Sequence, residues 1–250
     1  MSWALGPLAS FDIESSGVDV ESDRIVTATV VRINPGEPPI VRSWLINPGV
    51  EIPQLAIDVH GVTNEKAQAE GADPVAAIPE IRDCLADAWM AGLPVIAYNG
   101  CFDLTMLDRE CRRHYNRTLA HGFVVDPLVL DKAVDRYRKG SRKLVDVCAH
   151  YNVRLDGAHT SDGDALAAAR VAWRIAQRYP DMVGSQSLAD LQQAQTAWYA
   201  LQQRSLRDYL SKLAEKQDDL DEQAKLRVRA RDVNGTWPVK PFRVRAEAAA

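Results

Sequence analysis

The sequence contains no long apolar run, which excludes a membrane-spanning helix of about 18 consecutive apolar residues. The segment that begins at Met1 also has no basic residues ahead of an apolar stretch, as a signal peptide would. We therefore expect a soluble, cytoplasmic protein that has no membrane partner.

Cysteine and an excess of positive charge are also lacking. The four cysteines lie too far apart for a paired zinc motif and are too few for a disulfide scaffold, so we expect them to be reduced. Lysine and arginine together number 30 against 34 acidic residues, which gives a net charge of −4. No strong overall field therefore attracts the chain to nucleic acid, and any such contact must be local.

The chain does contain enough apolar residues, 46% of 250, for one substantial core. Three runs rich in strand-forming residues, at 8–13, 25–31 and 40–46, predict an antiparallel meander. Short apolar runs at 93–98 and 123–125 then alternate with helical patterns, which is typical of parallel strands joined by helices. The helices are expected at 74–90, 102–115, 144–151 and 164–179. The predicted fold is α/β, a mixed five-stranded sheet flanked by helices.

The composition changes beyond Pro180. Leucine and aromatic residues recur at roughly helical spacing through 187–223, which predicts a long amphipathic helix or a helical hairpin. This extension either packs back on the domain or serves as a partner-binding or self-associating arm. Residues 225–245 hold seven Lys or Arg and one Asp, as in a solvated, partly disordered tail or a phosphate-contacting arm. We expect one domain in residues 1–182, and a helical extension with a basic tail in 183–250.

Two carboxylates stand at the end of the first predicted strand. Asp12 and Glu14 are two positions apart, so their side chains leave the same face of the strand. Asp19 and Glu21 repeat this spacing among turn residues, where we expect them to be solvated. Carboxylates at the end of a buried strand need a cation or hydrogen-bond donors, which favours a metal site over a capping role for the first pair.

Asp103 follows the strand predicted at 93–98 and lies in the first turn of the next helix. A favourable interaction with the helix dipole is the simpler explanation of an acid at this place. If the strand lies beside the first one, however, Asp103 falls at the same sheet edge as Asp12 and Glu14. Open α/β sheets form their crevice at that edge.

His159 and Asp164 flank the start of the last predicted helix of the domain, which Thr160 or Ser161 would cap. Asp164 can bind a metal ion from the first turns of the helix, while His159 lies in the loop before it. Asp162 is a nearby alternative acid, and a single loop histidine is more often a surface residue. Only the coincidence with the other acidic segments singles out His159 and Asp164.

In this order the segments resemble the DEDDh 3′-to-5′ exonucleases, a family with a ribonuclease H-like fold that includes the proofreading epsilon subunit of bacterial replicative polymerase. The segments are Phe11-Asp12-Ile13-Glu14-Ser15-Ser16-Gly17, His60-Gly61-Val62-Thr63, Tyr98-Asn99 with Asp103, and His159 with Asp164. The resemblance spans residues 8–178. The family commonly has two threonines in place of Ser15 and Ser16, and Thr160 disfavours the related subclass with tyrosine at that position.

The resemblance implies the roles of the acidic residues and of the histidine. Two Mg²⁺ or Mn²⁺ ions would be held by Asp12, Glu14, Asp103 and Asp164, with His159 as the general base. Carboxylate oxygens suit such hard cations, and an imidazole with an ordinary pKa of about 6.5 can accept a proton from water. The implied reaction hydrolyses the terminal phosphodiester bond at the 3′ end of single-stranded DNA and releases a nucleoside 5′-monophosphate, in proofreading or repair.

The resemblance also implies contacts with the substrate. The terminal nucleotide would meet Ser15, Ser16 and Gly17, its base would lie against His60 and Val62, and the strand would be held by Asn99. A structural turn role for His60 and a helix-cap role for Asn99 are equally open. We expect weak, salt-sensitive, distributive binding that is confined to the last few nucleotides.

Two other functions stay open. The chain could be an exoribonuclease, because the family site tolerates either sugar. It could also be a catalytically idle module whose helical extension binds a polymerase or another partner. The complete set of five catalytic-type residues favours the exonuclease.

Overall fold

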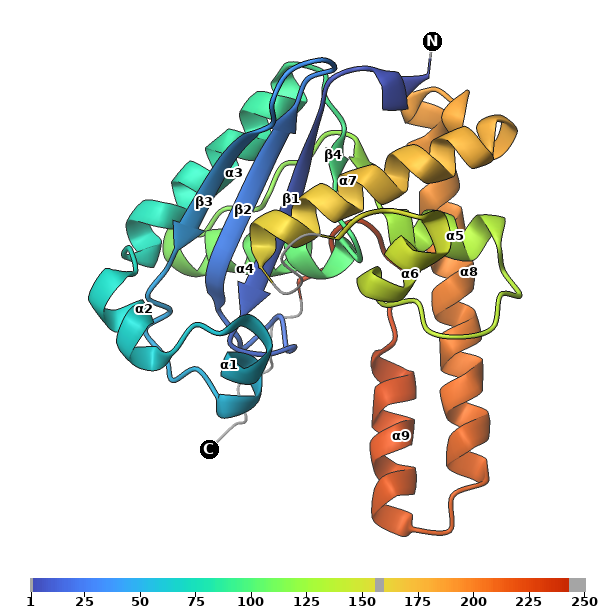
Figure 1. Ribbon diagram of the computed structural model, residues 1–250. Helices are drawn as coiled ribbons and strands as arrows, with labels where there is room; N and C mark the ends of the chain where they lie inside the picture. Colours follow the sequence, from blue (N-terminus) through green and yellow to red (C-terminus); the bar gives the residue numbers. More distant parts are fainter. Residues whose placement is uncertain (1, 156–159, 243–250) are drawn as a thin grey trace.

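A five-stranded sheet forms the centre of the computed structural model, which describes residues 2–155 and 160–242 (Figure 1). The strands are β1 (Leu8–Ser15), β2 (Ile25–Ile33), β3 (Ile40–Leu45), β4 (Val95–Ile96) and β5 (Val124–Val125). They lie in the order β3-β2-β1-β4-β5, in which β1, β2 and β3 are antiparallel neighbours and β4 and β5 continue the sheet parallel to β1. The mixed five-stranded α/β sheet predicted from the sequence is confirmed.

Helices cover both faces of this sheet. Those of the first 178 residues are α1 (Gln54–His60), α2 (Asn64–Glu70), α3 (Pro74–Met90), α4 (Cys101–Tyr115), α5 (Pro127–Val134), α6 (Leu144–Tyr151) and α7 (Ser161–Arg178). On one face lie α3 and α4, while α7 crosses the other face over β1 and β2, next to α5 and α6 (Figure 1). Short 3₁₀ and π turns occur at Trp3–Leu5 and Pro180–Gly184.

Capping residues explain where several of these helices begin. The side chains of Thr63, Asp73 and Asp126 accept backbone N–H bonds at the starts of α2, α3 and α5. A proline follows directly at the first position of α3 and α5, where its missing N–H costs nothing. The sequence analysis found α3, α4, α6 and α7 but missed α1, α2 and α5. Helices α1 and α2 bury at most one residue each, so they show no clear apolar period.

Strand β1 sends alternate side chains into two different cores. Phe11 and Ile13 are buried in the core under α3 and α4, whereas Leu8 belongs to the core under α7. The even positions of β1 therefore face α7, and these include Asp12 and Glu14 at the far end of the strand. The fold thus directs both carboxylates toward the helix that carries Asp164.

Buried Ser10 joins α7 to the sheet. Its hydroxyl donates to the carbonyl oxygens of Ala165, at 2.7 Å, and of Ile96, at 3.0 Å. The face of α7 that meets the sheet is rich in alanine, so the helix can approach closely. This contact fixes the first turns of α7, and with them Asp164, against β1.

The C-terminal part forms a helical hairpin, one of the two arrangements that the sequence predicts. Its helices are α8 (Leu188–Glu215) and α9 (Leu220–Asp232), and the hairpin projects from the rest of the fold (Figure 1). The first half of α8 packs on the domain, where Leu191, Gln195 and Tyr199 are buried. The prediction of a solvated tail from Lys225 is wrong in part, because this stretch begins inside α9 and Trp237 is buried after it. None of the helices in the described part of the chain combines the length and apolar character that a membrane crossing requires.

We expect Ser10→Ala to lower the free energy of unfolding by about 1–3 kcal/mol, because it removes a buried hydrogen-bond donor between α7 and the sheet. Urea denaturation followed by circular dichroism measures the change. As a control, Ser205→Ala removes an exposed hydroxyl that bonds only within α8, and it should change stability by no more than about 0.5 kcal/mol. Equal stability of Ser10→Ala and the unmodified protein would contradict this role.

Candidate active site

Three carboxylates meet where β1 ends and α7 begins. Asp12 lies opposite Thr29 and Glu14 opposite Thr27 on the neighbouring strand β2. Asp164 comes from the first turn of α7. Carboxylate oxygens of Asp12, Glu14 and Asp164 all lie within 4.8 Å of one another. Segments about 150 residues apart in the sequence therefore converge at one point.

The start of α7 is fixed by a hydroxyl contact across the sheet. The Ser161 hydroxyl, in the first residue of the helix, lies 2.7 Å from that of Thr29, which in turn lies 2.9 Å from that of Ser43. From this start Asp164 reaches the carboxylates of β1, whereas Asp162 is exposed. The structure thus places Asp164, and not its neighbour Asp162, in the cluster, as the sequence analysis expects.

Asp103 joins the cluster from α4. It is only 4% exposed, and its Oδ1 accepts a hydrogen bond of 3.2 Å from the backbone N–H of Ile13, the residue between Asp12 and Glu14. Its charge acts directly on Asp12 and raises the pKa of that carboxyl. All four acids predicted as metal ligands therefore lie at one end of β1.

The cluster is electrostatically strained. Burial is the main cause that raises the pKa of Asp12 well above its ordinary value, and the charges of Asp103, Glu14 and Asp164 add to it. Burial and the charge of Asp164 raise the pKa of Glu14 to about 7. In Asp103, burial raises the pKa while hydrogen bonds from its own backbone and from Ile13 oppose the rise.

Among the residues that the structure describes, no basic side chain pairs with the charges at β1 and α4. Within residues 2–155 and 160–242, no lysine, arginine or histidine forms an ion pair with Asp12, Glu14 or Asp103. Close, unneutralised carboxylate oxygens are the donor set that hard divalent cations prefer. The residues present therefore fit one or more divalent cations held by Asp12, Glu14, Asp103 and Asp164.

A pocket of about 410 Å³ opens beside the cluster. Its walls include Glu14 of the cluster together with His60 and Val62, the two residues that the sequence analysis assigns to a base pocket. They also include Trp44 of β3 and Lys66 of α2, which the sequence analysis missed. Neither residue could be assigned to the pocket from the sequence, because no neighbouring motif links Trp44 or Lys66 to the acidic segments. The pocket has the size of a small-molecule site of about 300–1,000 Å³.

His60 stabilises a turn with one ring nitrogen, while its other ring nitrogen forms no hydrogen bond with the described residues. Its Nδ1 accepts a 3.1 Å hydrogen bond from the N–H of Val62 across Gly61, whose φ of 72° ends α1. Its Nε2 is buried and has no hydrogen-bond partner among the described residues. Burial lowers the pKa of His60, so the neutral ring is favoured. The ring can therefore shape the turn and still contact a ligand in the pocket.

The other predicted substrate contacts lie outside the lining of this pocket. The hydroxyl of Ser15 donates to the carbonyl of Gly17 at 2.7 Å, and that of buried Ser16 donates to Asp23 at 2.9 Å. Asn99 has a φ of 58° and precedes Gly100, the residue that caps α4, so the alternative role of Asn99 as the helix cap is not observed. A role of these residues in substrate binding stays a prediction.

Two further predictions have different outcomes. His159 lies outside the described residues, although Thr160, the next residue along the chain, lines the pocket. The expectation that Asp19 and Glu21 are solvated holds for Asp19 but is wrong for Glu21, which is bound by Arg109. That arginine is far away in the sequence, so the turn composition around Glu21 could not reveal it.

Comparison with known proteins agrees with this geometry. The model of the Exonuclease family, RNase_T, matches residues 10–172. The DNA polymerase III PolC-type of Oceanobacillus iheyensis is 30% identical over 171 residues, which cover 67% of this chain and 11% of the relative. The PolC-type polymerase of Staphylococcus aureus is 23% identical over 174 residues. This chain thus spans about a tenth of the length of the curated relatives that it matches.

Solved structures share the fold. A zinc-bound complex of E. coli exonuclease I with single-stranded DNA gives a TM-score of 0.59 at 18% identity, covering 80% of this chain and 43% of the other. Exonuclease I of Methylocaldum szegediense gives a TM-score of 0.56 at 20% identity, covering 70% of this chain and 41% of the other. At these identities the likeness concerns the fold alone.

The carboxylate cluster should make the metal-free protein less stable as the pH rises. The pKa of Glu14 is raised from 4.5 to about 7 in the folded chain, so between these values the folded state binds more protons than the unfolded state. The free energy of unfolding therefore falls as the pH rises through this window. In chelator, well above pH 7, we expect Asp12→Asn to raise the melting temperature by about 2–4 °C, because it removes one of the repelling charges.

The same melts test metal binding. Mg²⁺ or Mn²⁺ should raise the melting temperature of the unmodified protein and should have little effect on Asp12→Asn. Asp208→Asn, which changes an exposed acid of α8, is the matched control and should behave like the unmodified protein. A lower melting temperature of Asp12→Asn in chelator would show that the cluster is not strained.

Proposed function

Because the chain belongs to the Exonuclease family, we propose that it is a metal-dependent 3′-to-5′ exonuclease that acts on single-stranded DNA. It hydrolyses the terminal phosphodiester bond and releases a nucleoside 5′-monophosphate. The observation that carries the proposal is the convergence of the carboxylates of Asp12, Glu14 and Asp164 beside a pocket of about 410 Å³.

The choice of DNA is supported by the proteins that resemble this chain. Its curated relatives are DNA polymerases, and the exonuclease I structures include complexes with single-stranded DNA. A role in proofreading or repair is consistent with those relatives. The same holds for a cytoplasmic location and for a polymerase as partner. The match covers 11% of the first of these relatives, so the activity of the whole polymerase is not carried over to this chain.

The four carboxylates and the histidine have different tasks. We assign two Mg²⁺ or Mn²⁺ ions to the oxygens of Asp12, Glu14, Asp103 and Asp164. Bound divalent cations supply positive charge at the scissile phosphate and lower the pKa of water. His159 accepts the proton of the attacking water, for which a neutral imidazole is suited near pH 7.

The surrounding pocket positions the end of the strand. The terminal base lies against His60 and Val62, and the ring of Trp44 offers a surface for stacking. Lys66, in the same wall, supplies a positive charge for a phosphate. In a chain of net charge −4, such local contacts carry the binding, so we expect weak, salt-sensitive affinity.

Digestion of matched DNA and RNA strands, each labelled at the 5′ end, tests this function. With Mg²⁺ we expect a ladder of products shortened one nucleotide at a time from the 3′ end of DNA, and no products when a chelator is added. Asp12→Ala should abolish the ladder by removing a metal-binding carboxylate, while Asp208→Ala should leave it unchanged. Digestion of RNA but not of DNA would show that RNA is the substrate. Full activity of Asp12→Ala would refute the proposed metal site.

A further inference from the structure

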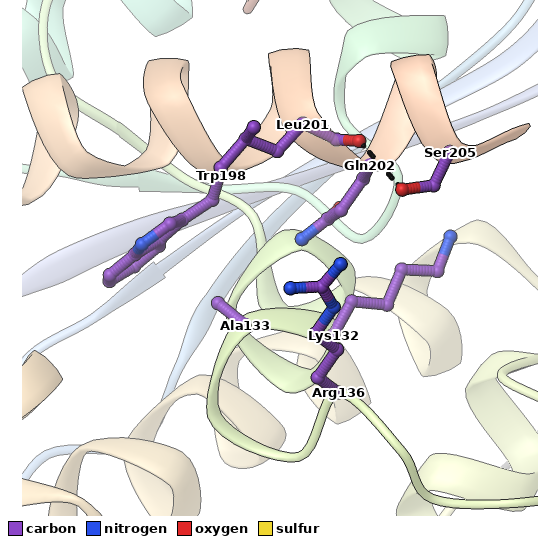
Figure 2. Close-up of a pocket in the computed structure, with 7 residues that line it drawn as sticks. All are labelled: Lys132, Ala133, Arg136, Trp198, Leu201, Gln202 and Ser205. Atoms are coloured by element: carbon purple, nitrogen blue, oxygen red, sulfur yellow. Dashed lines mark hydrogen bonds between the residues drawn. The ribbon is translucent and has the colours of Figure 1, made fainter. Parts of the chain in front are cut away.

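A pocket between α5 and α8, apart from the carboxylate cluster, brings together two basic side chains, while its Gln202 and Ser205 already donate to the carbonyls of Val129 and Leu201. Lys132 and Arg136 extend into it from α5 and the turn after it, and α8 contributes Trp198, Gln202 and Ser205 (Figure 2). None of the described residues that line it is acidic, and its volume is about 240 Å³. The pocket therefore offers two positive charges to an occupant and no negative charge.

In the described part of the chain, neither cation has a carboxylate partner of its own. Within the described parts of the chain Lys132 makes no hydrogen bond or ion pair, and the guanidinium carbon of Arg136 lies 5.6 Å from the centroid of the Tyr137 ring. Two acids act on Lys132 from a distance, and both are used elsewhere. Asp126 caps α5, and Asp131 accepts hydrogen bonds from two arginines and a tyrosine.

The segment that contains both cations also carries a net positive charge. Residues 126–143 hold six Lys or Arg and three Asp, in a chain whose net charge is −4. Burial lowers the pKa of Lys132, which means that its positive charge is poorly solvated where it lies. An anion bound next to it would offset this cost.

We propose that this pocket binds one phosphate group of the substrate strand, upstream of the nucleotide that is removed. Its volume is below the roughly 300–1,000 Å³ of typical small-molecule pockets, so a phosphate fits better than a whole nucleotide. Lysine, arginine and hydroxyl groups are the usual protein partners of backbone phosphates. The choice of a DNA strand as the source of the phosphate rests on the proposed function.

Strand binding in chelator, without turnover, tests the pocket. The double variant Lys132→Gln/Arg136→Gln should bind a long labelled DNA strand about tenfold more weakly in fluorescence anisotropy. The slope of log affinity against log salt should become shallower by about 0.7, the value for one phosphate contact. The control Lys212→Gln/Lys216→Gln removes two charges at exposed positions near the end of α8 and should leave both quantities unchanged.

The remaining outcomes separate the explanations. Unchanged strand affinity in the double variant overturns the proposal, and a loss of stabilisation by inorganic phosphate in that variant would then identify free phosphate as the occupant. An equal loss in the control variant would also overturn it, because the effect would be general electrostatics. If neither the unmodified protein nor the double variant Lys132→Gln/Arg136→Gln cleaves DNA, the proposed function fails, but the comparison of their strand affinities still tests the pocket.

A second inference comes from the C-terminal segment, residues 233–242, here called the strap. It leaves α9 and lies along α4, where the N–H of Lys240 donates to Thr105 at 3.0 Å and the carbonyl of Thr236 accepts from the thiol of Cys101 at 3.6 Å. Trp237 is buried in the core under α3 and α4. The strap is therefore an integral part of the domain surface.

Arg109 of α4 joins the strap to the loop that follows β1. Its guanidinium donates to the carbonyls of Lys240, at 3.2 Å, and Pro241, at 2.9 Å. The same group forks onto Glu21, with contacts of 2.8 to 3.0 Å to both carboxylate oxygens. Arg109 is only 3% exposed, and the ring of Phe242 lies 5.3 Å from its guanidinium carbon.

Glu21 belongs to a tightly held loop, residues 16–24. The hydroxyl of Ser16 donates to Asp23 at 2.9 Å and accepts from the N–H of Arg24 at 3.0 Å. At Gly17 a side chain has no room, because a Cβ would lie 2.4 Å from the Asp23 carboxylate. A shift of Glu21 would therefore be transmitted to Ser16 and Gly17, directly after Glu14.

We infer that Arg109 is a positioning residue, through which the strap sets the place of this loop against the terminal nucleotide. The inference rests on the proposed function, which places Ser16 and Gly17 at the substrate. The strap and the loop share one buried guanidinium, so a change on either side alters the other. Loss of this link should weaken strand binding and leave the chemical step intact.

Steady-state kinetics of Glu21→Gln and Phe242→Ala test the link. We expect Glu21→Gln to raise KM about tenfold while kcat changes less than about twofold, with a smaller rise in KM for Phe242→Ala. Stabilisation by Mg²⁺ should be unchanged, which a merely unfolded variant would not show. Glu37→Gln, at an exposed turn, is the control and should keep the unmodified KM.

An unchanged KM in Glu21→Gln, or a parallel loss of kcat and of the response to Mg²⁺, would overturn the positioning role. Strand affinity measured in chelator gives the same comparison without catalysis. An inactive unmodified protein would then contradict the proposed function, while a weaker affinity of Glu21→Gln would still support the link.

Discussion

Mutual repulsion among the partly buried carboxylates at the end of β1 is the constraint on which the rest of this structure depends. Asp12, Asp103 and Glu14 have raised pKa values because they are buried near one another, and no basic side chain of the described chain forms an ion pair with any of these three. Such a cluster costs stability, so other contacts must hold its members in place. The two cores on either side of β1 hold the strand in place, and bound divalent cations would reduce the repulsion.

The way the chain is held around the cluster follows from simple periodicities. Alternation along β1 buries Phe11 on one face and turns Asp12 and Glu14 toward α7 on the other. Small residues on α7 and the hydroxyl of Ser10 let that helix approach β1, which brings Asp164 to the same point. Around this centre the arginine network of α4 and the strap fixes the neighbouring loop without touching the carboxylates themselves.

Much of the fold was predictable because its signals are local. Alternating or continuous apolar runs identified all five strands, and apolar spacing identified the longer helices, while α1, α2 and α5 depend on caps and on tertiary packing. The acidic residues of the candidate site could be proposed because strand ends and helix starts can be recognised from sequence and because their order resembles a known family. Trp44 and Lys66 of the pocket, and the fork of Arg109 on Glu21, were not, since they depend on which distant segments the fold brings together.

The central claim is that the converged carboxylates form a divalent cation site. Anomalous scattering from crystals grown with Mn²⁺ tests it most directly, because it locates the ions independently of any activity. We predict anomalous peaks bonded to oxygens of Asp12, Glu14 and Asp164, and their loss in crystals of Asp12→Asn. Mn²⁺ found only elsewhere on the protein, with the cluster empty at saturating metal, would contradict the account.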